Sequence, residues 1–133
     1  MPNGFHGSAG QWEKMEGPFL QIDPLLEKFA KANAITVSKN YHNWPERSLK
    51  WSNGSLNKLI QIYLKDEERK TYCFWLCMSE DRGSRRYWKR QMLLDEVPWS
   101  KVYNELENHL EEGRKVIESW SSADLEFASN ISA

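Results

Sequence analysis

Cysteine is scarce in this sequence of 133 residues, which holds only two, Cys73 and Cys77. They lie four residues apart in a segment patterned like a β-strand, where a rise of about 3.3 Å per residue separates them by roughly 13 Å. A disulfide needs Cα atoms within about 7 Å, and the spacing is not the Cys-x-x-Cys of redox and zinc sites. We therefore expect two unpaired side chains that are buried as small hydrophobes.

Long apolar runs and an excess of charge are also lacking. No run approaches the roughly 18 residues that span a bilayer, and Met1 to His6 form neither a basic leader nor an apolar segment. The formal net charge is −1 and the pI is near 6.3, so no overall field attracts nucleic acid or an anionic membrane. We expect a cytoplasmic protein without a membrane partner.

The motifs of common enzyme classes are missing as well. The three histidines, His6, His42 and His109, have no metal-ligand spacing, and no Gly-x-Ser-x-Gly elbow, phosphate loop or dinucleotide fingerprint occurs. The sequence therefore predicts no metal and no cofactor. His109 is expected to be solvated on a Glu-rich helix, and His42, in a loop beside Glu46, is the one candidate for a catalytic base.

Large apolar side chains are plentiful. Hydrophobic residues make up 40% of the chain and include seven Trp, five Tyr and five Phe, which suffice for a core. The length suits one domain of about 100–200 residues. We expect a flexible leader over residues 1–17, a single domain over 18–120 and a loosely held tail over 121–133.

The first elements are predicted by caps and turns. Asp23 as N-cap and Pro24 at the first helical position indicate a helix over about 23–33, and residues 35–37 are a candidate first strand. Residues 41–45 have the composition of a loop. Asn53-Gly54 then suits a two-residue hairpin loop, which would set Trp51 opposite Leu56, both on one face, and Leu49 opposite Lys58.

The later elements follow from changes of period. Residues 71–78 are apolar on both faces, as in an interior strand, residues 80–83 form a charged turn, and residues 85–94 are basic enough for an edge strand. Apolar residues then recur every three or four positions over 98–120, which predicts one long helix. The fold class is α+β: an antiparallel meander of about four strands between two helices, which cover one face.

The densest unusual segment is Arg82 to Arg90, with five basic residues, two aromatic residues and no acid. Such a composition can hold phosphates while rings stack on bases, although the spacing does not match the RNA-recognition signature. The bland interpretation is a basic edge strand whose stems cover apolar neighbours and whose charges are neutralised by the glutamates of the last helix.

A four-residue loop at 80–83 would set Trp75 opposite Trp88, with Arg86 and Arg90 on the same face. Tryptophan beside arginine on an uncovered sheet face is typical of a protein-interaction hot spot. The first functional hypothesis is therefore a non-enzymatic protein that binds another protein or itself, and the second is binding of single-stranded nucleic acid. The third is an enzyme that uses His42. The candidate binding residues are Trp75, Arg85, Arg86, Tyr87, Trp88 and Arg90.

Overall fold

The structure is a computed structural model, and it describes residues 9–39, 46–66 and 68–127. Six antiparallel strands form one meander sheet in chain order, and helices precede and follow it. The elements are α1 (Ala9–Ala32), β1 (Thr36–Lys39), β2 (Glu46–Asn53), β3 (Leu56–Asp66), β4 (Thr71–Arg82), β5 (Arg85–Pro98), α2 (Trp99–Asn104), α3 (Leu106–Glu118), the 3-10 helix η2 (Ser122–Asp124) and β6 (Glu126–Phe127). The α+β class and the meander are confirmed, with six strands instead of about four.

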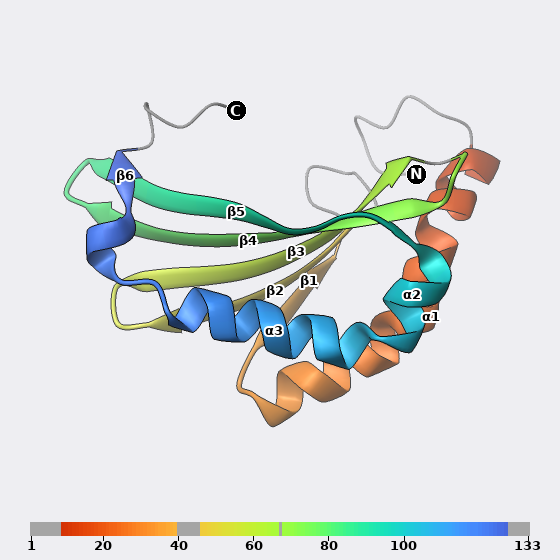
Figure 1. Ribbon diagram of the computed structural model, residues 1–133, viewed down its shortest axis with the longest axis horizontal. Helices are drawn as coiled ribbons and strands as arrows, with labels where there is room; N and C mark the ends of the chain where they lie inside the picture. The colour runs from red at the N-terminus through yellow and green to blue at the C-terminus, as the bar shows by residue number, and fades with distance from the viewer. Residues whose placement is uncertain (1–8, 40–45, 67, 128–133) are drawn as a thin grey trace.

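The three α-helices of the described residues lie on the same side of the curved sheet (Figure 1). α1 contacts β1 and β2, and α2 and α3 contact β3, β4 and β5. Buried side chains at alternate strand positions meet them, among them Leu49, Ile60 and Leu76. α3 approaches closely because of Gly113, where a Cβ would stand 3.0 Å from Leu76 Cδ2. The core therefore lies on one face of the sheet, and the described helices leave the other face uncovered.

The first helix is longer than the predicted helix over 23–33. It begins at Ala9, so half of the expected leader is helical, and Met15 is buried against the core. Pro18 and Pro24 both lie inside the helix, and Asp23 is a buried interior residue, so the N-cap assignment was wrong. Buried residues recur every three or four positions from Met15 onward, so the helical period continues through both prolines. The buried residues after Met15 are Phe19, Ile22, Leu26 and Phe29.

The β2–β3 hairpin is confirmed, but its loop is Gly54-Ser55 instead of Asn53-Gly54. Gly54 has φ +63°, which suits the first position of a two-residue loop with glycine there. Trp51 therefore pairs with Lys58 and not Leu56. Because partners shift by two residues, the predicted faces survive, and Trp51 and Leu56 still share one face. The segment 41–45, predicted to be a loop, lies outside the described residues.

The β4–β5 hairpin has the same kind of loop, Gly83-Ser84, where a four-residue loop was predicted. Gly83 has φ +65°, and Arg82 pairs with Arg85. Trp75 is therefore opposite Met92 instead of Trp88, which pairs with Ser79. The shift is again even, so the faces are those expected. β4 lies between β3 and β5, as predicted for an interior strand.

The predicted helix over 98–120 is two helices that meet at Glu105, whose backbone (φ −116°, ψ 19°) leaves the helical region. Neither proline nor glycine marks this break in the sequence. The described part of the tail contacts the sheet. Ser122 donates to Glu80 and accepts from Arg82, and β6 pairs with Tyr87 and Trp88 of β5. Residues 128–133 lie outside the described residues.

A buried ion pair joins α1 to the sheet. Arg47 of β2 is fully buried, and its Nε and Nη2 donate to the two carboxylate oxygens of Asp23 at 2.7 and 3.0 Å. Its guanidinium also lies 5.1 Å from the centre of the Phe19 ring and 3.8 Å from Glu16. A bidentate pair of this kind fixes orientation as well as contact. It sets the place of α1 over β2.

Removing one partner of this pair should destabilise the protein strongly. Asp23→Leu removes the carboxylate that accepts both hydrogen bonds from the buried Arg47 guanidinium, and we expect the free energy of unfolding to fall by about 3–5 kcal/mol in urea titrations. The double variant Asp23→Leu with Arg47→Met should recover much of that loss, because it also removes the buried Arg47 charge. A double variant as unstable as the single variant would contradict this interpretation.

His109 is buried, contrary to the expectation of a solvated residue. Its ring packs edge-on against Phe74, with centroids 5.3 Å apart, and its Nε2 is buried without a hydrogen-bond partner among the described residues. Burial disfavours the imidazolium and lowers the pKa of His109, against the opposing effects of Glu105 and the Lys101 backbone. The histidine is therefore neutral in the folded protein at pH 7.

Stability should depend on this histidine at mildly acidic pH. The unfolded chain binds a proton at His109 near pH 6.5, whereas the folded chain binds it only at lower pH. The contribution of the neutral histidine to the free energy of unfolding is therefore fully present above about pH 6.5 and is lost as the pH falls below it. His109→Phe should flatten that fall in urea titrations from pH 8 to pH 5. Depressed carboxylate pKa values, as at Glu80, act only below about 4.5. Equal slopes for both proteins would contradict the assignment.

Candidate functional site

The open face is the sheet surface opposite the helices. It is formed by the side chains that alternate with the core positions, and the paired registers set them in rows across the strands. Its central members are Lys50, Leu59, Gln61, Trp75, Ser79, Arg86, Trp88 and Arg90, together with the buried Ser48 and Cys77. Strong hydrogen-bond donors and aromatic rings thus lie side by side on a surface without a helix above it.

Strand alternation divides the six candidate residues between the two faces. Trp75, Arg86, Trp88 and Arg90 share the open face, as the predicted register required. Arg85 and Tyr87 point to the helix side, where β6 meets them. That any of the six binds a partner stays a prediction.

Trp75 is held in place by two neighbours on the open face. Its Nε1 donates to the Tyr63 hydroxyl at 2.6 Å, and the Arg90 guanidinium carbon lies 4.4 Å from the centre of its ring. Burial raises the pKa of Tyr63, so the hydroxyl stays protonated at neutral pH. The exposed Arg90 therefore rests on a fixed aromatic platform, an arrangement that limits its rotamers.

Arg86 and Trp88 lie nearer the β4–β5 loop. Arg86 donates from Nε and Nη2 to Asp81 at 2.8 and 3.3 Å, and this exposed pair lowers the pKa of the Asp81 carboxyl. Trp88 is half-buried, and its Nε1 is buried without a hydrogen-bond partner in the described part of the chain. A buried indole N–H normally finds an acceptor, and none of the described residues supplies one here.

The basic residues on the other side of β4 and β5 are engaged with aromatic rings. The Arg82 guanidinium lies 4.3 Å from the Tyr87 ring centre, that of Arg85 lies 5.0 Å from Phe127, and Lys89 Nζ lies 5.0 Å from Trp120. Among the residues described, no ion pair joins the glutamates of α3 to this strand. The expected neutralisation by the last helix is thus replaced by cation–π contacts that fasten the C-terminal segment.

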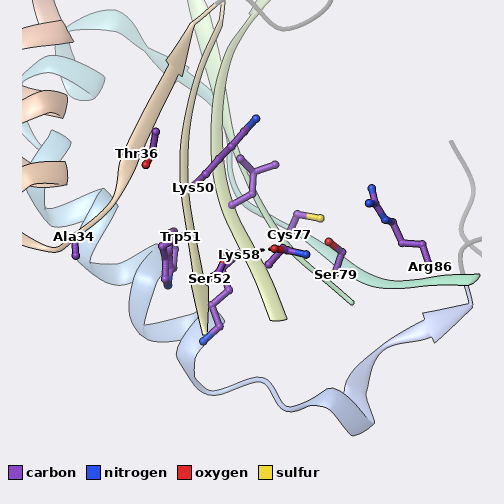
Figure 2. A pocket seen from close by; sticks show the side chains of 11 residues that line it. Ala34, Thr36, Lys50, Trp51, Ser52, Lys58, Cys77, Ser79 and Arg86 are labelled. Atoms are coloured by element: carbon purple, nitrogen blue, oxygen red, sulfur yellow. Dashed lines mark hydrogen bonds between the residues drawn. The ribbon is translucent and has the colours of Figure 1, made fainter. Parts of the chain in front are cut away.

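A shallow groove of about 700 Å³ crosses the open face from β1 to β5. Figure 2 shows Lys50 and Cys77 projecting to one side of the sheet and Trp51 to the opposite side, toward α3. Lys50 and Arg86 line the groove from the open face, Lys58 is also in its lining although its side chain points to the helix side, and no Asp or Glu of the described residues lines it. Sequence reasoning missed Lys50 and Leu59, although the alternation of β2 and β3 carries the signal for both.

Neither cysteine is suited to nucleophilic chemistry. Both are unpaired and buried, as predicted, on the open-face side of β4. Burial raises the pKa of the Cys77 thiol to about 11 and also raises that of Cys73, so both are thiols and not thiolates at neutral pH. Cys77 therefore contributes apolar surface to the groove.

His42, the candidate catalytic base, lies outside the described residues. Among the residues that the structure describes, no three His, Cys, Asp or Glu side chains are grouped to hold a metal ion. In the same part of the chain, none of the helices has the length and apolarity needed to cross a membrane.

Comparison with known proteins gives no guide to the site. No protein-family model matches the chain, and neither a curated protein nor a solved structure is significantly similar to it. The function must therefore be argued from the geometry of the open face.

The two tryptophans of this face should differ in their effect on stability. Trp75→Ala removes a platform that contacts Tyr63 and Arg90 in an interior strand, and we expect the free energy of unfolding to fall by about 2 kcal/mol or more. Trp88→Ala, on β5, should cost clearly less and leave the domain folded. Chemical denaturation of both variants measures the difference, and unfolding of Trp88→Ala in the absence of denaturant would show that its ring is part of the core.

Proposed function

We propose that the chain is a non-enzymatic interaction protein that binds another protein on the open face. The observation that supports this most is that Trp75, Arg86, Trp88 and Arg90 occupy the sheet face that the described helices leave uncovered. Tryptophan and arginine dominate the energetics of protein interfaces because they offer large contact areas and several hydrogen bonds. The Trp88 side chain is only half-buried, so part of its ring surface is available to a partner.

Two observations favour a protein partner over single-stranded nucleic acid. Arg90 already lies over the Trp75 ring, so that ring is not free to stack on a base. Arg85 and Tyr87 of the basic–aromatic segment point to the helix side. The segment therefore does not form one continuous track of cations and rings.

Neighbouring residues of β5 supply matched controls for a binding experiment. Arg86, Trp88 and Arg90 point to the open face, whereas Arg85, Tyr87 and Lys89 point away from it. Proteins retained from a lysate of cells that express the chain would be quantified by mass spectrometry for each alanine variant. We expect at least one protein to be retained by the wild type and by the Arg85, Tyr87 and Lys89 variants, and lost with Trp88→Ala or Arg90→Ala.

The affinity for the purified partner should then fall by about 30-fold with Trp88→Ala, which corresponds to about 2 kcal/mol for a central anchor. Identical retention by the two sets of variants would refute the proposal. Self-association is tested by sedimentation of the same variants. Tight binding of a dT oligonucleotide, with a salt slope lowered by about 1 in Arg90→Ala, would instead establish the nucleic-acid function.

A further inference from the structure

Four open-face residues form one straight row across the middle of the sheet. Lys50 of β2 pairs with Leu59 of β3, Leu59 pairs with Cys77 of β4, and Cys77 pairs with Arg90 of β5. The row therefore carries a cation at each end and two apolar side chains between them. Lys50, Leu59 and Cys77 line the groove, and Arg90 continues the row onto β5.

The two cations of this row have no counter-charge among the described residues. Lys50 and Arg90 are exposed, and neither forms an ion pair with a described residue, unlike Arg86, which pairs with Asp81. No carboxylate of the described residues lines the groove between them. Arg90 is also held by the Trp75 ring. The row thus offers two exposed positive charges, of which Arg90 is positioned by the Trp75 ring, to a ligand with two negative ones.

The spacing of the row matches an extended peptide. Neighbouring strands are about 4.8 Å apart, so the three steps from β2 to β5 set the Cα atoms of Lys50 and Arg90 roughly 14 Å apart. Residues i and i+4 of an extended peptide are also roughly 14 Å apart at about 3.4 Å per residue, and the side chains of i, i+2 and i+4 share one side. Residue i+2 then lies over Leu59 and Cys77.

We infer that the open face binds an extended acidic segment of the partner protein, with Asp or Glu at positions i and i+4 and an apolar residue at i+2, laid across the strands. The inference rests on the proposed function. β2, β3 and β4 are paired on both sides, and the segment crosses the strands instead of lying along β5, so the peptide is recognised by side chains and not by addition to a sheet edge.

Synthetic peptides test this spacing directly. The probe is a fluorescein-labelled peptide, Gly-Glu-Ser-Leu-Ser-Glu-Gly, and its controls have Gln in place of both Glu, or the two Glu placed two or six residues apart. We expect fluorescence anisotropy to show binding of the first peptide, at least about tenfold weaker binding of each control, and weaker binding at higher salt. Equal affinity for all spacings, or no binding of any peptide, would overturn the inference.

Charge reversal on the protein identifies the contacts. Lys50→Glu should weaken the peptide about tenfold or more, whereas Lys115→Glu, on the exposed side of α3, should leave it unchanged. Two further peptides carry Lys in place of the first or of the second Glu. Only one of them should restore binding to Lys50→Glu, and which one it is gives the direction in which the peptide lies across the strands. Failure of restoration in both orientations would contradict the pairing of Lys50 with a ligand carboxylate.

The outcomes separate this inference from the proposed function. If partner capture depends on Trp88 and Arg90 but no peptide shows the spacing preference, the open face binds a protein in another way. If Lys50→Glu instead abolishes self-association or oligonucleotide binding, the row serves a second copy or a nucleic acid, and the peptide inference is wrong.

Discussion

The ion pair between Arg47 and Asp23 is the contact on which the arrangement of the layers depends. It lies in the core between α1 and β2, where an ionised group is tolerated only with a well-oriented partner. Apolar contacts with Phe19 or Ile22 could form with α1 turned or shifted, because the hydrophobic effect has no direction. The bidentate pair allows far fewer positions, so it selects one place for the helix on one face of the sheet.

A second charged contact has the same role at the other end of the core. Lys58 is almost completely buried under α3 and donates to Glu118 at 2.8 Å, and the same carboxylate accepts a hydrogen bond from Trp51 Nε1. The two bonds lower the pKa of Glu118. Ion pairs thus hold both α1 and α3 against the same side of the sheet. The uncovered face is a consequence of where these charges lie in β2 and β3.

The alternation of strand residues explains how much of the site could be predicted. Both hairpin loops were misplaced, yet both errors were even in number, so Trp75, Trp88 and Arg90 were assigned to the correct common face. The positions of Arg47, Lys58 and His109 could not be predicted, because sequence patterns treat charged and polar residues as exposed and only the folded structure shows their partners. Likewise, Pro18 and Pro24 have the sequence signature of breaks in a helix that the core contacts of Met15 and Phe19 hold together.

In the proposed binding mode, the sheet fixes the distance between the two charges that the ligand must match, from Lys50 to Arg90. The spacing between the positions of this row is set by main-chain hydrogen bonds between β2, β3, β4 and β5, which do not depend on the side chains that the strands carry. Substitutions at the four positions of the row can therefore change which ligand side chains are recognised without changing the distance between them. A surface on loops would lack this separation of chemistry from length, since loop geometry shifts with sequence. In this protein the tolerance for a ligand that touches both ends is fixed by the stiffness of the backbone.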